Sequence, residues 1–408
     1  MPTIAIVGAG PSGASAARAL LAENAGFDID LYESRQSFGG LWNYSPTHGP
    51  MYRTMDANVP RSLIGFTGFP LAPGSLYPTR EEVLQYLIKY TQDVTRSLHV
   101  NVYFGEKVLK VVKQNGKWRV ETGSRTGLYD FVVLASGHYE FPYIPPIGGL
   151  LNNPIAIHSV EYDTPEEFLG KKVLIIGNAR SATDLAIQIL GVTHPISISR
   201  RHEGPTDSVF DMDPGAVNWK PEVSRVENCK VIFSDGTEDV FDRIVVSTGY
   251  LYEFPFLELG VNGLHHKSRL RLQNIYKHTF YTEDPTLTTI AINKGMVPFP
   301  AMETQAAVIA RVWSGRLTLP PHAEMKREEY KTESIHGSEE RFHELTMYQD
   351  IKFLQDLWQW ADQAPGGFEA EHWTPKKVEF RKECGSIKAK DYARRVLESK
   401  ARRQSSST

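Results

Sequence analysis

The sequence has few cysteines and no long apolar run, and both absences exclude classes of protein. Only Cys229 and Cys384 occur in 408 residues, which excludes a disulfide framework and a CxxC motif for redox exchange or zinc. No stretch approaches the roughly 20 apolar residues of a membrane-spanning helix. The formal net charge of −3 gives no support to nucleic acid or an anionic membrane as a partner. No targeting signal opens the chain, so we expect a cytoplasmic protein.

Two copies of one strand–turn–helix–strand pattern indicate the fold class. The first copy has an apolar strand at 3–7, the turn at 8–13, a helix from Ser15 and a second strand ending at Glu33. The second copy has a strand at 172–176, a turn at 177–182, a helix over 184–190 and a strand ending at Arg200-Arg201. Short apolar strands that alternate with helices predict an α/β fold with parallel sheets. We therefore expect two Rossmann-like dinucleotide-binding domains.

The first turn, Gly8-Ala9-Gly10-Pro11-Ser12-Gly13, has the spacing of a dinucleotide fingerprint. The first glycine permits the tight turn, the second admits the pyrophosphate, and the third lets helix and strand pack closely. The N–H groups that open the helix face the phosphates. Glu33 follows at the distance from which a carboxylate accepts hydrogen bonds from ribose hydroxyls. This copy predicts a site for an ADP-containing dinucleotide.

The second turn, Gly177-Asn178-Ala179-Arg180-Ser181-Ala182, is less regular. Ala179 stands in place of the second glycine, so its methyl group is expected to hold the pyrophosphate slightly away from the backbone. Arg200 and Arg201 stand where an acidic residue would bind a free ribose, and cations there suit a 2′-phosphate. Together the two copies predict a flavoprotein that binds FAD in the first domain and NADPH in the second.

The expected organisation is an NADP domain inserted in a discontinuous FAD domain. Residues 1–165 are the first part of the FAD domain, 166–255 the NADPH-binding domain, and 256–408 the second part with a helical C-terminal tail. The further elements expected are helices at 79–95 and 301–313 and strands at 108–112, 118–121, 131–135, 243–247 and 288–293. The charged tail from about Pro320 is expected to be peripheral.

Several stretches resemble the flavin-containing monooxygenases, and most closely their compact fungal-type members. They are the turn 8–13, Glu33 with Gly39-Gly40-Leu41-Trp42, Ala57-Asn58-Val59-Pro60, the segment 77–83, the hinges at 135–138 and 247–250, Ser181-Ala182-Thr183-Asp184 with Arg200, and 298–316 with Gln305. The family signature FxGxxxHxxxY/F is only half present. His158 and Tyr162 match it, but Asn152 and Pro154 replace its phenylalanine and glycine.

The resemblance implies a set of site residues, with Asn58 as the expected catalytic residue. Asn58 would donate a hydrogen bond to the flavin peroxide or to the NADP⁺ amide. The cofactor-binding residues expected are Gly8, Ala9, Gly10, Pro11, Ser12, Gly13, Glu33, Ser34, Arg35, Gly40, Leu41, Trp42, Ala57, Asn58, Val59, Ser136, Gly137, Gly177, Asn178, Ala179, Ser181, Ala182, Thr183, Asp184, Arg200, Arg201, Thr248, Gly249 and Gln305. No metal site is expected.

The activity that the resemblance implies is NADPH- and O2-dependent oxygenation of a soft nitrogen or sulfur atom of a small molecule, as in N,N-dimethylaniline monooxygenases. The oxygen would come from a C4a-hydroperoxide of FAD. Three alternatives stay open at this point: an NADPH oxidase or electron transferase that releases H2O2, Baeyer–Villiger oxygenation, and a protein that binds both cofactors only to sense or interact. A homodimer is also possible. Tyr162, where Baeyer–Villiger enzymes usually carry tryptophan, favours heteroatom oxygenation.

Overall fold

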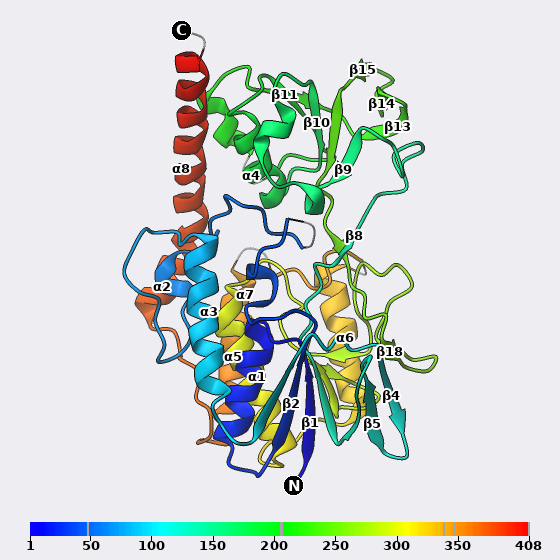
Figure 1. Cartoon of the computed structure of the whole chain (residues 1–408), viewed down its shortest axis with the longest axis vertical. Helices are drawn as coiled ribbons and strands as arrows, with labels where there is room; N and C mark the ends of the chain where they lie inside the picture. Colours follow the sequence, from blue (N-terminus) through cyan, green and yellow to red (C-terminus); the bar gives the residue numbers. More distant parts are fainter. Residues whose placement is uncertain (47–48, 205–206, 338, 346–347, 407–408) are drawn as a thin grey trace. The chain divides into compact units, whose positions relative to one another are not determined.

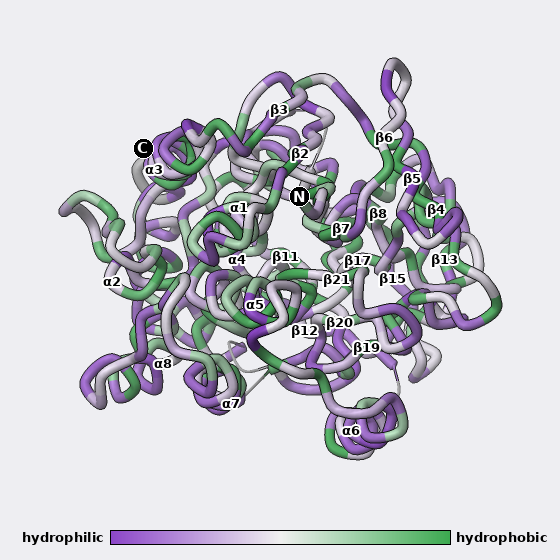
Figure 2. Tube along the Cα trace, turned by 90° about the horizontal axis from the view of Figure 1, so that it is seen from below, coloured by the Kyte–Doolittle hydropathy of each residue, from purple (hydrophilic) through white to green (hydrophobic). Residues whose placement is uncertain are grey.

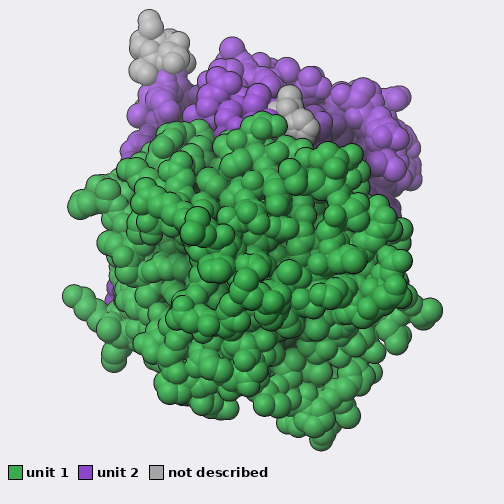
Figure 3. Space-filling view, turned by 60° about the horizontal axis from the view of Figure 1, so that its bottom comes forward, with its two compact units in different colours: residues 1–43, 56–138, 251–382 green, residues 44–55, 139–250, 383–408 purple. Residues whose placement is uncertain are grey.

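The structure is a computed structural model that describes residues 1–46, 49–204, 207–337, 339–345 and 348–406. The chain forms two compact units, which Figure 3 shows in different colours. Unit 1 consists of residues 1–43, 56–138 and 251–382. Unit 2 consists of residues 44–55, 139–250 and 383–408. Each unit holds one of the two copies of the sequence pattern, so the predicted α/β fold with two Rossmann-like domains is confirmed.

The main sheet of unit 1 has seven strands in the order β19-β20-β21-β7-β1-β2-β3. The strands from β21 to β3 pair in parallel, and β19 and β20 add antiparallel pairs at one edge. Their bounds are β1 Thr3–Val7, β2 Asp28–Glu33, β3 Val100–Phe104, β7 Phe131–Leu134, β19 Ile275–Tyr276, β20 Phe280–Tyr281 and β21 Leu287–Thr289.

Helices α1 and α5 pack against each other in unit 1, and α3 lies beside α1 (Figure 1). α3 begins as the sequence predicts, because Thr79 and Glu82 form a capping box that satisfies the first N–H groups. The helices of this unit are α1 Pro11–Ala22, η1 Gly40–Trp42, α2 Arg61–Ile64, α3 Arg80–Val94, α5 Pro298–Trp313, α6 His322–His336 and α7 Gln349–Ala361.

Unit 1 also carries a four-stranded sheet in the order β18-β4-β5-β6. Its strands are β4 Lys110–Gln114, β5 Lys117–Glu121, β6 Thr126–Tyr129 and β18 Leu257–Glu258. Asn115 and Gly116 join β4 to β5 with φ angles of +50° and +80°. Two successive residues with positive φ form the hairpin turn whose twist matches that of paired strands, and asparagine followed by glycine is the usual sequence for it.

Unit 2 is organised around a five-stranded parallel sheet in the order β12-β11-β10-β16-β9. Its strands are β9 Ala156–His158, β10 Val173–Ile176, β11 Ile196–Ser199, β12 Val217–Lys220 and β16 Arg243–Val246. A three-stranded sheet contains β13 Val223–Glu227, β14 Lys230–Phe233 and β15 Glu238–Val240, and the short strands β8 Phe141–Pro142 and β17 Tyr250–Leu251 pair with each other. The helices are η2 Ser159–Glu161, η3 Pro165–Phe168, α4 Arg180–Ile189 and η4 Asp207–Met212.

The charged tail is more deeply integrated than the sequence suggests. α6 is largely exposed and mostly hydrophilic in Figure 2, but α7 buries Asp350, Leu354 and Leu357. The tail ends in α8, a helix over Pro375–Ser406, whose bounds the expectation of a helical C-terminal tail did not give. Tyr392 and Val396 of α8 are buried in the hydrophobic core of unit 2. The high charge of α8 conceals its narrow apolar stripe, so the expectation of a peripheral tail was wrong for α7 and α8.

The compact units divide the chain at positions other than the predicted limits of 165 and 255. Residues 139–165 belong to unit 2, because β9 pairs with β16 in the sheet of that unit. Residues 44–55 and 383–408 belong to it as well. The pairing of strands that are distant in the sequence decides which unit a segment joins, and the sequence pattern does not show this pairing.

Candidate functional site

The first glycine turn connects β1 to α1 and allows no side chain at two of its positions. Gly8 has φ = +109°, and a Cβ there would lie 2.6 Å from the carbonyl oxygen of Ala135. A Cβ on Gly13 would lie 2.0 Å from the Gly8 oxygen, so the third glycine lets α1 approach β1. The N-cap Gly10 gives α1 no side-chain cap. The N–H groups that open α1 therefore suit a pyrophosphate.

The Glu33 carboxylate fixes the turn to the end of β2. Its Oε2 accepts the Ala9 N–H at 2.9 Å, and its Oε1 accepts the Arg35 N–H at 2.9 Å and the Ser34 hydroxyl at 3.3 Å. Glu33 is only 6% exposed. An ionised carboxylate has about four lone-pair sites, so one remains for a ribose hydroxyl. The geometry is compatible with the predicted role toward ribose and adds a structural one.

The segment Gly39–Trp42 lies directly against the glycine turn. A Cβ on Gly40 would come within 2.9 Å of the Gly10 Cα. The Arg35 guanidinium donates to the carbonyl oxygens of Gly40 and Asn43, which fixes the segment to the end of β2. Trp42 is buried and packs edge-to-face on Phe299 of α5, with ring centroids 6.5 Å apart. Leu41, which stands between Gly40 and Trp42 in the sequence, is partly buried.

Asn58 stands on a loop that the neighbouring segment holds in place. The Ala57 N–H donates to the Pro78 oxygen and the Arg61 N–H to the Leu76 oxygen, each at 2.8 Å. Ala57 and Val59 are buried, whereas Asn58 is exposed. The Arg61 side chain also donates to the Ala72 and Ser75 oxygens and pairs with Glu82 at 2.6 Å. A rigid loop with one exposed amide suits the expected hydrogen-bond donor.

Three other predicted residues of unit 1, Ser136, Gly137 and Gln305, lie in different surroundings. Ser136 and Gly137 follow β7 and are exposed. Gln305 is fully buried, and its side chain is engaged within the protein. Its Oε1 accepts the Ala291 N–H at 3.0 Å, and its Nε2 donates to the Thr279 hydroxyl at 3.0 Å. Ala291 has φ = +60°, so Gln305 supports a strained backbone position, a role that the sequence did not indicate.

The second glycine turn repeats the backbone of the first. Gly177 has φ = +107°, and a Cβ there would lie 2.5 Å from the Ser247 oxygen. Ala179 has φ = −77° and ψ = 177°, close to the −77° and −173° of Gly10, so its backbone tolerates a methyl group. Ala179 and Ser181 are exposed, and Ala182 is fully buried. The second turn is thus preformed, with a methyl group where the first has none.

The polar residues around this turn contact other parts of unit 2. Asp184 of α4 pairs with Arg395 of α8 at 2.6 Å. Asn178 Nδ2 donates to the His202 oxygen at 2.8 Å, and the Thr183 hydroxyl donates to the Ala179 oxygen at 3.4 Å. The sequence did not identify Arg395 because an ion pair across 211 residues leaves no local pattern. Asp184 therefore has a structural partner as well as its predicted place near NADP.

Arg200 and Arg201 follow β11, on the sheet edge where the ribose is expected. The Arg200 guanidinium pairs with Asp207 and lies 4.0 Å from the centre of the Trp219 ring. Arg201 is exposed. The sequence indicated neither Asp207 nor Trp219 as a partner of Arg200, because Trp219 reaches it from the neighbouring strand β12. Arg200 is thus held in a defined position by a carboxylate and a ring.

His158 and Tyr162, the part of the family signature that this chain keeps, lie in unit 2, and His158 contacts the hinge at 247–250. His158 is buried, which lowers its pKa to about 4, and its Nε2 is 3.1 Å from the Gly249 oxygen. The Tyr162 hydroxyl donates to Gln188 Oε1 at 3.0 Å. The Thr248 hydroxyl donates to the Tyr143 oxygen at 2.5 Å. His158 and Tyr162 thus have structural contacts in place of acid–base surroundings.

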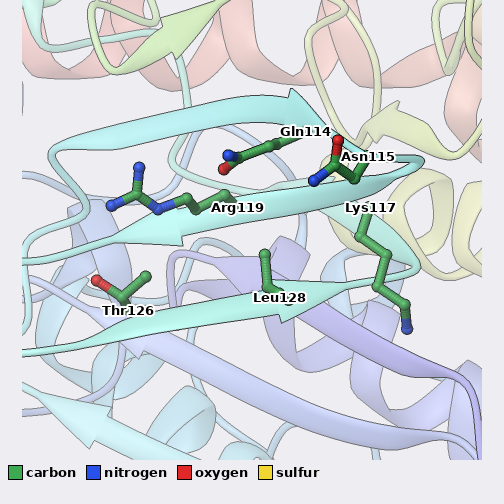
Figure 4. A pocket seen from close by; sticks show the side chains of 6 residues that line it. All are labelled: Gln114, Asn115, Lys117, Arg119, Thr126 and Leu128. Atoms are coloured by element: carbon green, nitrogen blue, oxygen red, sulfur yellow. The ribbon is translucent and has the colours of Figure 1, made fainter.

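A pocket of about 270 Å³ lies on the antiparallel sheet of unit 1 (Figure 4). Six side chains line it: Gln114, Asn115, Lys117, Arg119, Thr126 and Leu128. Its two cations pair with neighbouring carboxylates, Lys117 with Asp130 and Arg119 with Glu121. The pocket contains none of the predicted cofactor-binding residues.

Within the described part of the chain, no helix combines the length and the apolar character that a membrane crossing requires. The same residues form no group of three or more His, Cys, Asp or Glu side chains placed to hold a metal ion.

The two glycine turns, each at the end of a strand that pairs in parallel with its neighbours, are typical of flavoproteins that bind two dinucleotides, and comparison with known proteins gives the family. The model of pyridine nucleotide-disulphide oxidoreductases matches residues 5–219, and that of flavin-binding monooxygenase-like proteins matches residues 211–366. The chain is 32% identical over 394 residues to flavin-containing monooxygenase FMO GS-OX-like 2 of Arabidopsis thaliana, covering 87% of this chain and 83% of that protein.

Two further similarities extend along most of the chain. The thiol-specific monooxygenase of Saccharomyces cerevisiae is 28% identical over 411 residues, 93% of this chain and 90% of that protein. The structure of S-allyl-L-cysteine S-oxygenase from Allium sativum superposes with a TM-score of 0.82 at 27% identity and covers 98% of both chains. The chain belongs to the flavin-containing monooxygenase family.

Family membership confirms the resemblance and the class of enzyme. The chain is a FAD-dependent monooxygenase that oxygenates sulfur or nitrogen, which makes a purely sensing role wrong. Membership implies a flavin and a nicotinamide nucleotide as cofactors and a small molecule as substrate. The individual residues that bind them remain predictions.

Proposed function

We propose that this enzyme uses NADPH, FAD and O2 to oxygenate the sulfur of a small thiol or thioether. The observation that carries the choice of sulfur is its chain-long similarity to an S-allyl-L-cysteine S-oxygenase at 27% identity and to a thiol-specific monooxygenase at 28%. For a thioether, one oxygen atom of O2 enters the sulfoxide, and the other leaves as water with two electrons from NADPH and one additional proton.

The residues present fit FAD in unit 1. Gly8 and Gly13 let the turn and α1 pack closely on the sheet, and the start of α1, which no side chain caps, offers N–H groups to a pyrophosphate. The remaining lone pair of Glu33 suits a ribose hydroxyl. When bound, the flavin supplies the two-electron chemistry that activates O2. Asn58, held on its rigid loop, would orient the reacting oxygen or the nicotinamide amide through a hydrogen bond.

The residues of unit 2 fit a nicotinamide nucleotide, and Arg200 favours NADPH over NADH. The start of α4 is exposed at Ala179 and Ser181, so a phosphate can approach its first N–H groups. The guanidinium of Arg200 suits a 2′-phosphate because its planar N–H groups match phosphate oxygens. A cytoplasmic location and a homodimer remain predictions of the sequence.

Product analysis with matched substrates tests the proposed function. Purified enzyme with FAD and NADPH is given S-methyl-L-cysteine or reduced glutathione, with N,N-dimethylaniline as the nitrogen substrate. We expect oxygenated sulfur products by mass spectrometry and NADPH consumption that depends on the sulfur compound. Oxygenation of N,N-dimethylaniline alone would contradict the choice of sulfur. Substrate-independent NADPH consumption with one H2O2 per NADPH would favour the oxidase alternative. Conversion of cyclohexanone to its lactone would favour Baeyer–Villiger oxygenation.

A further inference from the structure

Asp207, at the start of η4, connects three parts of the nucleotide end of unit 2. Its Oδ2 accepts the Gly204 N–H at 2.8 Å and an Asn178 Nδ2–H at 3.3 Å, and it pairs with Arg200. The Asp207 residue is 9% exposed. Asn178 belongs to the glycine turn and Arg200 to the end of β11. One carboxylate thus joins the predicted pyrophosphate site to the predicted ribose site.

An aromatic ring and a carboxylate hold the guanidinium of Arg200 in position. Trp219 of β12 supports the guanidinium with its ring face 4.0 Å away, and the Arg200 N–H donates to the Lys220 oxygen at 3.1 Å. Asp207 neutralises the guanidinium on another side, and the exposed Glu203 carboxylate is 3.8 Å away. Arg200 is therefore oriented for a planar contact, while part of its charge is balanced by Asp207.

We propose that Asp207 is a specificity-determining residue for the nicotinamide nucleotide. It holds Arg200 over Trp219, and its negative charge opposes the 2′-phosphate that Arg200 attracts. This inference rests on the proposed use of NADPH. The 2′-phosphate is the only group that distinguishes NADPH from NADH, so Asp207 sets how strongly the enzyme prefers NADPH and how readily NADP⁺ leaves.

The substitution Asp207→Asn separates the charge of this residue from its hydrogen bonds. The amide oxygen of asparagine still accepts the Gly204 N–H, and the residue keeps its size, but the negative charge is lost. Asp211→Asn is the matched control, because Asp211 lies in the same short helix and is exposed. Asp207→Ser, whose hydroxyl also accepts the Gly204 N–H without a charge, is a second variant in case asparagine prevents folding.

The measurement is the ratio of two dissociation constants on the FAD-loaded enzyme. Isothermal titration calorimetry gives the affinity for adenosine 2′,5′-bisphosphate and for adenosine 5′-monophosphate, which differ by the 2′-phosphate. Removal of the negative charge that competes with the 2′-phosphate for Arg200 is expected to increase the preference for the bisphosphate about tenfold. The affinity for the monophosphate is expected to stay within about twofold, and Asp211→Asn to leave the ratio as in the wild type.

An unchanged or smaller ratio in Asp207→Asn and Asp207→Ser would overturn the inference, because Asp207 would then only position Arg200. The same increase in Asp211→Asn would also overturn it, since the effect would be one of general charge. Neither ligand carries a nicotinamide, so these outcomes are independent of sulfur oxygenation. Wild-type enzyme that binds the monophosphate at least as tightly as the bisphosphate would instead contradict NADPH use.

Discussion

Acid is expected to destabilise unit 1 through a group of buried histidines. His343 Nε2 accepts the Leu272 N–H at 3.0 Å, so the proton of this ring is on Nδ1. The Nδ1 atoms of His343 and His278 are 2.9 Å apart, and His343 must donate in this hydrogen bond. His278 therefore carries its own proton on Nε2. Protonation of either acceptor nitrogen would place two N–H groups against each other or against a backbone N–H.

Burial also lowers the pKa values of these rings. It lowers the pKa of His278 and of His138 to about 3, from an ordinary 6.5, and the pKa of His343 well below 6.5. The nearby charges of Lys294 and Arg271 further oppose protonation of His343. Below pH 6.5 the unfolded chain binds protons that the folded chain does not, so stability falls progressively from pH 6.5 to about pH 3. At pH 5 His138 and His278 are each expected to cost about 2 kcal/mol.

The assay is urea unfolding of the FAD-loaded enzyme at pH 7 and pH 5, followed by circular dichroism and by release of flavin fluorescence. In His278→Asn, the amide oxygen still accepts from His343 but cannot be protonated in this range. We expect this variant to lose about 2 kcal/mol less between the two pH values than the wild type. His99→Asn, at an exposed histidine, is the control. Equal losses in the wild type and in His278→Asn would refute the reasoning.

Three further predictions concern the proposed site. Gly13→Ala is expected to abolish flavin binding, because its Cβ would lie 2.0 Å from the Gly8 oxygen, whereas Gly123→Ala, with open space around it, is expected to keep the visible flavin absorbance. Ala179→Gly is expected to lower the KM for NADPH a few-fold at unchanged flavin content, and an unchanged KM would show that the methyl group does not impede the pyrophosphate. Asn58→Ala is expected to keep FAD and to release more H2O2 per NADPH consumed, and full coupling to product would contradict its role.

Elements with local signals could be predicted from the sequence. The strand–glycine–helix order at 3–22 and the capping residue Thr79 act within a few residues, so their patterns are legible in one chain. The helix α4 begins at Arg180, four residues before the predicted start, because the sequence does not show how far the turn extends into the helix. The strand β3 was not predicted, since only Val100 of it is buried and its alternation is weak.

The partners of the site residues could not be predicted, because they come from distant parts of the chain. Gln305 reaches Ala291 and Thr279, and Arg395 reaches Asp184 across 211 residues. A fingerprint identifies which residues lie near a nucleotide and says nothing of the protein groups that also engage them. For this reason Gln305 was expected at the cofactor, whereas its contacts place it in the interior of unit 1.

The difference between the two turns bears on how the two nucleotides are used. Their backbones agree, with φ of +109° at Gly8 and +107° at Gly177. The first turn is buried from Ala9 to Gly13, with Gly40 against Gly10, whereas Ala179 and Ser181 of the second turn are exposed. A nucleotide held by the first turn has part of its binding surface covered by the chain, so its release requires that cover to move. Within unit 2, Ala179 and Ser181 have no such cover. If FAD binds at the first turn and the nicotinamide nucleotide at the second, as proposed, we expect FAD to dissociate more slowly than the nicotinamide nucleotide.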